Sequence, residues 1–216
     1  AVEASIASLA GHVPSETELR DVYYDAPAHA LTLSNRWLRK RQGIWELKVP
    51  RNGEEPGMYT ELTSHGDIAL ELSACLLGRE EDTAATSSSS GAHVDLEAHV
   101  ARLGVAPFAE LVTRRRTYLL PELPGVGPVT ADLDEELATG DLVGELEVKL
   151  PLGADDASVG TARQCLELFA RDIGIALIAV GGNKLLKFIE RNDAAHFAEL
   201  MQVLKARRPS QASRQR

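Results

Sequence analysis

The stretch WLRKRQGIWELK, residues 37–48, decides the fold that the sequence predicts. Segments 36–41 and 44–49 both alternate apolar with charged side chains, which is typical of a strand with one buried face. Gln42-Gly43 separates the two segments, and a glycine at the second position of a two-residue turn can adopt the positive φ that a β-hairpin needs. The pattern therefore predicts an antiparallel hairpin that carries an unusual number of cations.

The charged side chains of this hairpin gather on one face. Since successive side chains of a strand point to opposite sides, Trp37, Arg39 and Arg41 share a face. On the second strand Glu46 and Lys48 share the polar face, and the other face is wholly apolar. Two interpretations remain open at this point: the polar face is a solvated surface with cross-strand ion pairs, or it is a phosphate-and-metal site closed from solvent.

Two later predicted strands, 129–134 and 142–150, repeat the alternation with carboxylates. Asp132 and Asp134 share one face of the first strand, and Glu145 and Glu147 share one face of the second. Carboxylates two residues apart on a strand lie close enough to share one hard cation, and Mg²⁺ and Mn²⁺ prefer such oxygen ligands. Together with a basic strand predicted at 110–120, they would supply the groups that phosphoryl transfer requires.

Helical periodicity and turn residues predict the remaining elements. Further strands are predicted at 21–25 and 58–63, and helices at 3–10, from 67 to Gly78, before Gly104, and at 157–173, 184–190 and 193–206. The polar, low-complexity segment 79–91 is predicted to be a disordered loop. We expect a single domain over residues 1–208 and a flexible tail at 209–216.

The chain as a whole is acidic, which makes its basic clusters informative. Its 216 residues carry a net charge of −9, and the pI is about 5.2. Because proteins that bind nucleic acids or membrane surfaces through charge are usually basic, we expect neither partner. Cys75 and Cys165 are too far apart for a metal-binding motif, and no apolar run reaches the ~18 residues of a membrane span. A cytoplasmic location is therefore predicted.

A series of short motifs follows along the chain from about Ile6 to Arg191. In order they are DVYYDAP, RWLRKR, IWELKVP, YTELT, LVTRRR, TADLD, GELEVKL and GGNKLL. This series resembles the CYTH (triphosphate tunnel metalloenzyme) family, and within it the likeness is greatest to the thiamine triphosphatase branch. The resemblance implies an α+β fold in which an antiparallel eight-stranded β-barrel encloses a triphosphate-binding tunnel and helices pack around it.

The resemblance also implies roles for individual residues. The positions that match the family's phosphate-binding and catalytic cations are Arg39, Arg41, Lys48, Arg115 and Lys184. Trp37 would stack on an aromatic group such as the thiamine ring, and Glu61 matches the acid of the YxEL strand in the substrate site. The positions that match the ligands of Mg²⁺ or Mn²⁺ are Asp132, Glu145 and Glu147. Tyr23, Tyr24 and Asp25 match a structural stretch beside the tunnel, whereas Lys40, Arg114 and Arg116 are expected to face away from it.

The activity that the resemblance implies is metal-dependent hydrolysis of thiamine triphosphate to thiamine diphosphate and phosphate. The alternatives are hydrolysis of inorganic tripolyphosphate, class IV-type adenylate cyclase chemistry, and triphosphate binding without catalysis. A small-molecule triphosphate is then the expected partner of a monomeric protein. The family's ExExK motif lies on a strand before the first helix, and this sequence begins at that helix, so we expect that strand to be missing. A literal ExExK occurs at Glu145, Glu147 and Lys149, on the late acidic strand.

Overall fold

The computed structural model of the protein describes residues 2–51, 59–78, 94–151, 153–176 and 183–206. Its helices are α1 (Val2–Ala10), η1 (Pro27–His29), α2 (Ala30–Leu33), α3 (His65–Leu77), α5 (Leu96–Arg102), α6 (Asp156–Asp172), α7 (Lys184–Asn192) and α8 (Ala194–Ala206). Its strands are β1 (Ser15–Asp25), β2 (Trp37–Arg41), β3 (Ile44–Pro50), β4 (Tyr59–Leu62), β5 (Ala106–Leu123), β6 (Gly127–Glu136) and β7 (Leu142–Val148). The loop predicted at 79–91 and the tail predicted at 209–216 lie outside the described residues.

One sheet of seven strands runs through the described residues in the order β4-β3-β2-β1-β5-β6-β7. The antiparallel sheet with accompanying helices confirms the predicted α+β class. Of the family's eight-stranded barrel, expected here without its first strand, the described residues form seven strands and no closed barrel: β4 and β7 are the two ends of the sheet, and no ladder joins them among the described strands. A barrel closes only where its end strands pair with a consistent tilt and stagger, so without that ladder the sheet stays open.

The chain divides into two compact units. Unit one comprises Ala1–Leu19 and Val112–Lys184, and unit two comprises Arg20–Leu111 and Leu185–Arg216. Strands β1 and β5 contribute residues to both units. That residues 1–208 form one CYTH-like domain stays a prediction. None of the helices in the described part of the chain combines the length and hydrophobicity needed to cross a membrane.

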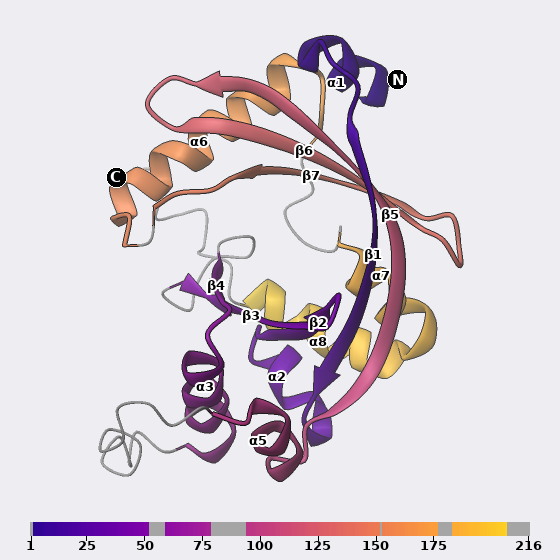
Figure 1. Ribbon diagram of the computed structural model, residues 1–216, viewed down its shortest axis with the longest axis vertical. Coiled ribbons are helices and arrows are strands. Elements are labelled where there is room, and N and C mark those ends of the chain that lie inside the picture. Colours follow the sequence, from indigo (N-terminus) through magenta and orange to yellow (C-terminus); the bar gives the residue numbers. More distant parts are fainter. Residues whose placement is uncertain (1, 52–58, 79–93, 152, 177–182, 207–216) are drawn as a thin grey trace. The chain divides into compact units, whose positions relative to one another are not determined.

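The core of unit one forms on one face of β5, β6 and β7. Alternate residues of β5 and β6, among them Tyr118, Leu120 and Val129, are buried there. Ile6 of α1 completes this cluster, and Phe169 of α6 packs against it. Figure 1 shows α6 lying along these strands. Because side chains alternate, the charged residues of the same strands must point to the opposite face.

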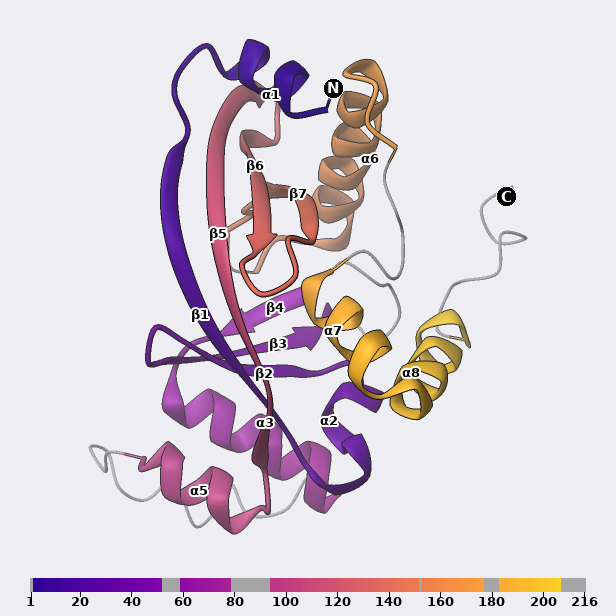
Figure 2. The same cartoon turned by 90° about the vertical axis from the view of Figure 1, so that its right-hand side faces the viewer.

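The core of unit two forms in the same way on β2 and β3. Leu38, Trp45 and Leu47 pack against the helices α3 and α5, for example against Ile68 and Leu72 of α3. Figure 2 shows α3 and α5 beside these strands. The apolar face that the hairpin sequence predicts is therefore buried, which leaves the face with Trp37, Arg39 and Arg41 on the other side of the sheet.

The turn of this hairpin depends on Gly43. Gln42 and Gly43 have φ angles of 50° and 83°, which is the left-handed region that a two-residue hairpin turn requires. A Cβ at Gly43 would meet nothing within 4 Å, so a side chain there is opposed only by the backbone angle. We expect Gly43→Ala to lower the free energy of unfolding by about 1–2 kcal/mol in urea titrations. Gly160→Ala is the matched control.

Gly160 lies inside α6, and a Cβ there also meets nothing within 4 Å. A helical backbone suits alanine better than glycine, so this variant should gain about 0.5–1 kcal/mol. If both substitutions changed the free energy of unfolding equally, the positive φ of the turn would not explain the effect of Gly43→Ala.

Candidate functional site

The polar face of unit one lies on β5, β6 and β7. Residues directly opposite each other in an antiparallel ladder share a face. The pairs on this face are Arg115 with Asp134, Thr117 with Asp132, Asp132 with Glu145, and Thr130 with Glu147. The predicted cation Arg115 and the three predicted metal ligands are thus brought onto one surface, as the alternation of the sequence suggested.

Arg115 is held by carboxylates on three sides. Its Nε and Nη2 each donate a hydrogen bond of 2.7 Å to one carboxylate oxygen of Asp134. Its Nη1 lies 2.5 Å from Asp132 Oδ2, and its Nη2 lies 3.9 Å from Glu145 Oε2. Burial by itself lowers the pKa of Arg115, but the bonds and charges of these acids outweigh burial and raise it. The guanidinium is therefore a permanent cation in a fixed orientation.

Lys184, the first residue of α7, joins the same cluster. Its Nζ lies 3.3 Å from Asp134 Oδ2 and 3.3 Å from the hydroxyl of Thr113, and its side chain is buried. Burial by itself raises the pKa of Asp134. The hydrogen bonds from Arg115 and the charge of Lys184 outweigh burial, so the pKa lies below its usual range. Asp134 is thus a buried carboxylate that stays ionised between two cations.

A pocket of about 390 Å³ opens on this face. Its lining residues are Arg115, Thr117, Leu119, Pro128, Thr130, Asp132, Glu147 and Lys149. Asp132 is buried and Glu145 is half exposed, with a side-chain exposure of 49%. Carboxylate oxygens in this number, partly open to water, suit Mg²⁺ or Mn²⁺, which keep some of their water ligands. Glu145 and Glu147 are open to such an ion, whereas the oxygens of Asp132 accept from Thr117 at 2.6 Å and pair with Arg115, so Asp132 would have to exchange a partner to bind it.

The polar face of unit two carries arginines that are held in the same manner. Arg41 donates from Nε and Nη2 to the two oxygens of Asp21, at 2.6 and 2.8 Å. Arg39 donates from Nε to Glu46 at 2.7 Å and lies 4.0 Å from Asp21. Asp21 has no exposed surface, so it needs both cations to be stable inside the protein. The cross-strand ion pairs that one interpretation of the sequence predicted are present.

The other predicted residues of unit two lie on the same face. Lys48 is opposite Trp37 and also opposite Glu61, with 3.8 Å between its Nζ and the Glu61 carboxylate. The indole N–H of Trp37 donates to Asn35 at 3.2 Å, and the hydroxyl of Tyr59 donates to the same oxygen at 2.9 Å. Trp37 is only 7% exposed. Its ring is thus fixed in orientation and largely covered.

The three cations that we expected to face away from the site do so. Lys40 forms an ion pair with Glu97 and lies 5.1 Å from the ring centroid of Trp45. Arg114 is paired with Glu16 and Glu135. Arg116 is paired with Glu3 of α1. The predicted site residues therefore form two groups, one in each unit.

Asp134 was grouped with the other acids of its predicted strand but was left out of the predicted site, and Asp21 and Asn35 were given no role in it. Asp134 had a detectable signal, because it lies two residues after Asp132 on a predicted strand and so shares its face. Asp21 and Asn35 gave none. Their importance comes from which side chains lie opposite or beside them in three dimensions, which no local pattern contains.

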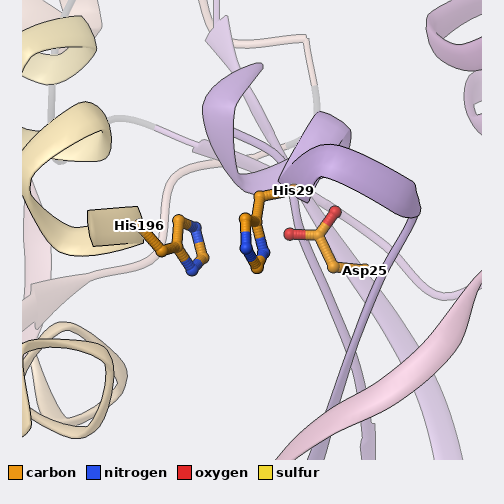
Figure 3. Close-up of side chains that lie close together, drawn as sticks. All are labelled: Asp25, His29 and His196. Carbon is orange, nitrogen blue, oxygen red and sulfur yellow. The ribbon is translucent and has the colours of Figure 1, made fainter. Parts of the chain in front are cut away.

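A further group of possible metal ligands lies in unit two. Figure 3 shows His29 and His196 face to face, with Asp25 beside His29. The ring centroids are 3.6 Å apart and the planes differ by 10°. An imidazole binds a metal near its own ring plane at ~2.0–2.1 Å, and two nearly parallel planes at this spacing share no such point. As placed, the two rings do not hold one ion together.

Asp25 already has hydrogen-bonding partners. Its oxygens accept bonds from the backbone N–H groups of Ala26 and Leu31, at 2.7 and 2.8 Å. They also accept one of 2.6 Å from the hydroxyl of Thr32, which in turn lies 2.8 Å from Nε2 of His196. The group joins the corner between β1 and α2 to α8, and its arrangement is that of a structural network.

His196 should make stability depend on pH. Burial and the neighbouring His29 lower the pKa of His196, and the charges of Asp25 and Asp193 only partly oppose this. The unfolded chain then binds a proton more readily than the folded one, so stability is complete above the unfolded pKa of ~6.5 and falls as the pH drops below it. For one group the loss cannot exceed about 1.4 kcal/mol per pH unit. Melting temperatures between about pH 7.5 and 5.5 measure it.

His29→Gln should make this decline shallower, because it removes the like charge that faces His196. His12→Gln is the control, since His12 is exposed and bonds only to the nearby carbonyl of Ala10 among the described residues. An unchanged pH profile in His29→Gln would rule out the stacked pair as the cause.

Comparison with known proteins relates this arrangement to a family. Two curated relatives, each named thiamine-triphosphatase, are 28% identical to the chain. The protein of Macaca fascicularis aligns over 218 residues, which cover 98% of this chain and 89% of the relative. The protein of Homo sapiens aligns over 212 residues, which cover 95% and 86%.

Solved structures are similar at lower identity. A protein from Pyrococcus horikoshii OT3 has a TM-score of 0.49 and 18% identity, covering 87% of this chain and 93% of that one. A putative adenylyl cyclase from Hippeastrum, described as having a dominant triphosphatase activity, has a TM-score of 0.47 and 15% identity, covering 88% and 90%. The sequence model of the CYTH domain matches residues 1–174. Because this match spans most of its length, the chain belongs to the CYTH family.

Proposed function

We propose that the protein hydrolyses the terminal phosphoanhydride bond of a triphosphate, with thiamine triphosphate as its preferred substrate. The observation that carries this proposal is the pocket of unit one, where Arg115 and the carboxylates of Asp132 and Glu147 line one cavity. The names of the two relatives at 28% identity support a triphosphatase and make thiamine triphosphate the first substrate to test.

Each charged side chain has a proposed task. Arg115 and Lys184 bind phosphate oxygens in unit one, and Arg39, Arg41 and Lys48 do so in unit two. Arginine binds a phosphate through paired N–H groups, whereas lysine acts as a compact charge. By stabilising the charge that develops on the phosphate oxygens, these cations would contribute most of the catalysis. Asp132, Glu145 and Glu147 would hold Mg²⁺ or Mn²⁺, which when bound neutralises phosphate charge.

Trp37 and Glu61 are proposed to contact the substrate beyond its phosphates. Trp37 would offer its indole to the thiamine ring, in the orientation that its bond to Asn35 fixes. Only 7% of this side chain is exposed, and inorganic tripolyphosphate needs no ring contact. Tripolyphosphate is therefore the second substrate to compare.

The experiment is phosphate release from thiamine triphosphate, tripolyphosphate and ATP, with Mg²⁺, with Mn²⁺ and with EDTA. Metal-dependent release that is fastest with thiamine triphosphate is the expected result. Formation of cyclic AMP and pyrophosphate from ATP would instead indicate an adenylate cyclase. A rise in melting temperature with tripolyphosphate but no phosphate release would indicate a binding protein without catalysis.

A further inference from the structure

Asp134 differs from Asp132, Glu145 and Glu147 because two cations, Arg115 and Lys184, both bond to its carboxylate. Nε of Arg115 bonds to Oδ1, while Nη2 of Arg115 and Nζ of Lys184 both bond to Oδ2. The side chain is 4% exposed. A carboxylate that is buried and bonded in this way has little capacity left for a metal, in contrast to Glu145, which is half exposed.

The two hydrogen bonds to Asp134 fix how the guanidinium of Arg115 is turned. Arginine has five N–H groups in a rigid plane, and the fork to Asp134 uses one on Nε and one on Nη2. The remaining N–H groups are on Nη1 and Nη2. These nitrogens lie 2.5 Å from Asp132 and 3.9 Å from Glu145, the carboxylates proposed to hold the metal. The edge of the guanidinium that does not bond to Asp134 is thus directed at these carboxylates, and its Nη1 is paired with Asp132.

The hydrogen bond from Lys184 places a second cation on the carboxylate of Asp134. Because Nη2 of Arg115 and Nζ of Lys184 both donate to Oδ2 of Asp134, one oxygen atom sets the spacing between the two positive groups. Two cations at this spacing would repel each other without the carboxylate between them. Asp134 therefore controls the orientation of one cation and its distance from the next.

We propose that Asp134 is a positioning residue, which holds Arg115 and Lys184 in the geometry that binds two oxygens of one triphosphate, without itself touching the ligand or the metal. This inference rests on the proposed function. It differs from a purely structural role in one measurable way. A structural ion pair affects how much protein is folded, whereas a positioning residue affects how tightly the folded protein binds.

The test is the affinity of folded protein for tripolyphosphate in EDTA, measured by calorimetry. We expect Asp134→Asn to weaken binding roughly 30–100-fold, because the loss of the fork releases a charge-assisted contact. Asp134→Glu keeps the charge and should recover part of that loss. If Asp134→Asn does not fold, the binding of Asp134→Glu, expected to lie between wild type and Arg115→Lys, gives the answer.

A double variant distinguishes action through Arg115 from an independent effect. Once Arg115→Lys has removed the fork, adding Asp134→Asn should weaken binding less than about threefold further. Glu135→Gln is the matched control. Glu135 is the neighbouring acid on β6, pairs with Arg114 on the opposite face, and should leave the affinity unchanged.

Two results would overturn the inference alone: wild-type affinity in Asp134→Asn, or losses that multiply in the double variant. Failure of the wild-type protein to bind tripolyphosphate would instead overturn the proposed function, and this inference with it.

Discussion

Arg115→Ala should destabilise the protein by about 3 kcal/mol and weaken tripolyphosphate binding by one to two orders of magnitude. Removal of one partner from a buried ion pair leaves an uncompensated charge. Here two carboxylates, Asp132 and Asp134, would lose their main cation, and both are nearly buried. For a chain of this size the melting temperature should fall by roughly 6–12 °C.

The lower melting temperature of Arg115→Ala could come from unpaired carboxylates or from lost packing, and adding a divalent metal distinguishes the two causes. Mg²⁺ at millimolar concentration should raise the melting temperature of Arg115→Ala more than that of the wild type, because the freed carboxylates gain a counterion. Arg114→Ala is the control, since Arg114 is half exposed, and it should stay within about 0.5 kcal/mol of wild type. A melting temperature unchanged in Arg115→Ala would contradict the role of Arg115 as the counterion of these acids.

The second large effect is expected for the exposed acids of the same face. The double substitution Glu145→Gln and Glu147→Gln removes two proposed metal ligands while it keeps their shape. We expect Mn²⁺ affinity and metal-dependent phosphate release to fall on the order of 10–100-fold. Binding of Mn²⁺ alone, followed by electron paramagnetic resonance, measures the first effect without any substrate.

Folding should be almost unaffected by this double substitution, because Glu145 and Glu147 are both exposed. Glu135→Gln again serves as the control, since it removes one carboxylate from the opposite face of β6. If Glu135→Gln weakened Mn²⁺ binding as much as the double substitution does, the ligand assignment would be wrong.

The elements that could be predicted from the sequence are those in which apolar and polar residues alternate with the period of a strand or a helix. The hairpin of β2 and β3 was predicted with its turn, because Gln42-Gly43 and the flanking alternation are local signals. The seven observed strands all contain a predicted segment, and six helices were predicted. The short helices η1 and α2 were not predicted, since three and four residues contain too little periodicity to detect.

The long strands were predicted too short for a related reason. β1 begins at Ser15, whereas the prediction began at residue 21. Its first six residues are exposed or partly exposed, so their side chains show no alternation between a buried and an open face. Such a segment is a strand because of its backbone pairing, and pairing between distant segments leaves little trace in composition.

The candidate site was predicted to the extent that strand alternation determines which side chains share a face. Arg115, Asp132, Glu145 and Glu147 could be grouped from their spacing and the family resemblance. Which carboxylate binds which cation could not be predicted. The fork between Asp134 and Arg115 depends on the register of β5 against β6, and a shift of one residue would have placed Arg116 opposite Asp134 instead.

The ion pairs on these strands affect how an anion approaches the protein. Arg39, Lys48 and Arg115 each lie directly opposite a carboxylate, so their positive fields cancel within a few ångströms. Within the Debye length of about 8 Å at physiological salt, but outside contact with these pairs, a triphosphate experiences mainly the net charge of −9 of the whole chain, and farther away salt screens even this. Electrostatic steering therefore opposes encounter with a polyanion and does not accelerate it. The protein would therefore select its ligand at contact distance, through the hydrogen bonds of its arginines and lysines, and not by long-range attraction.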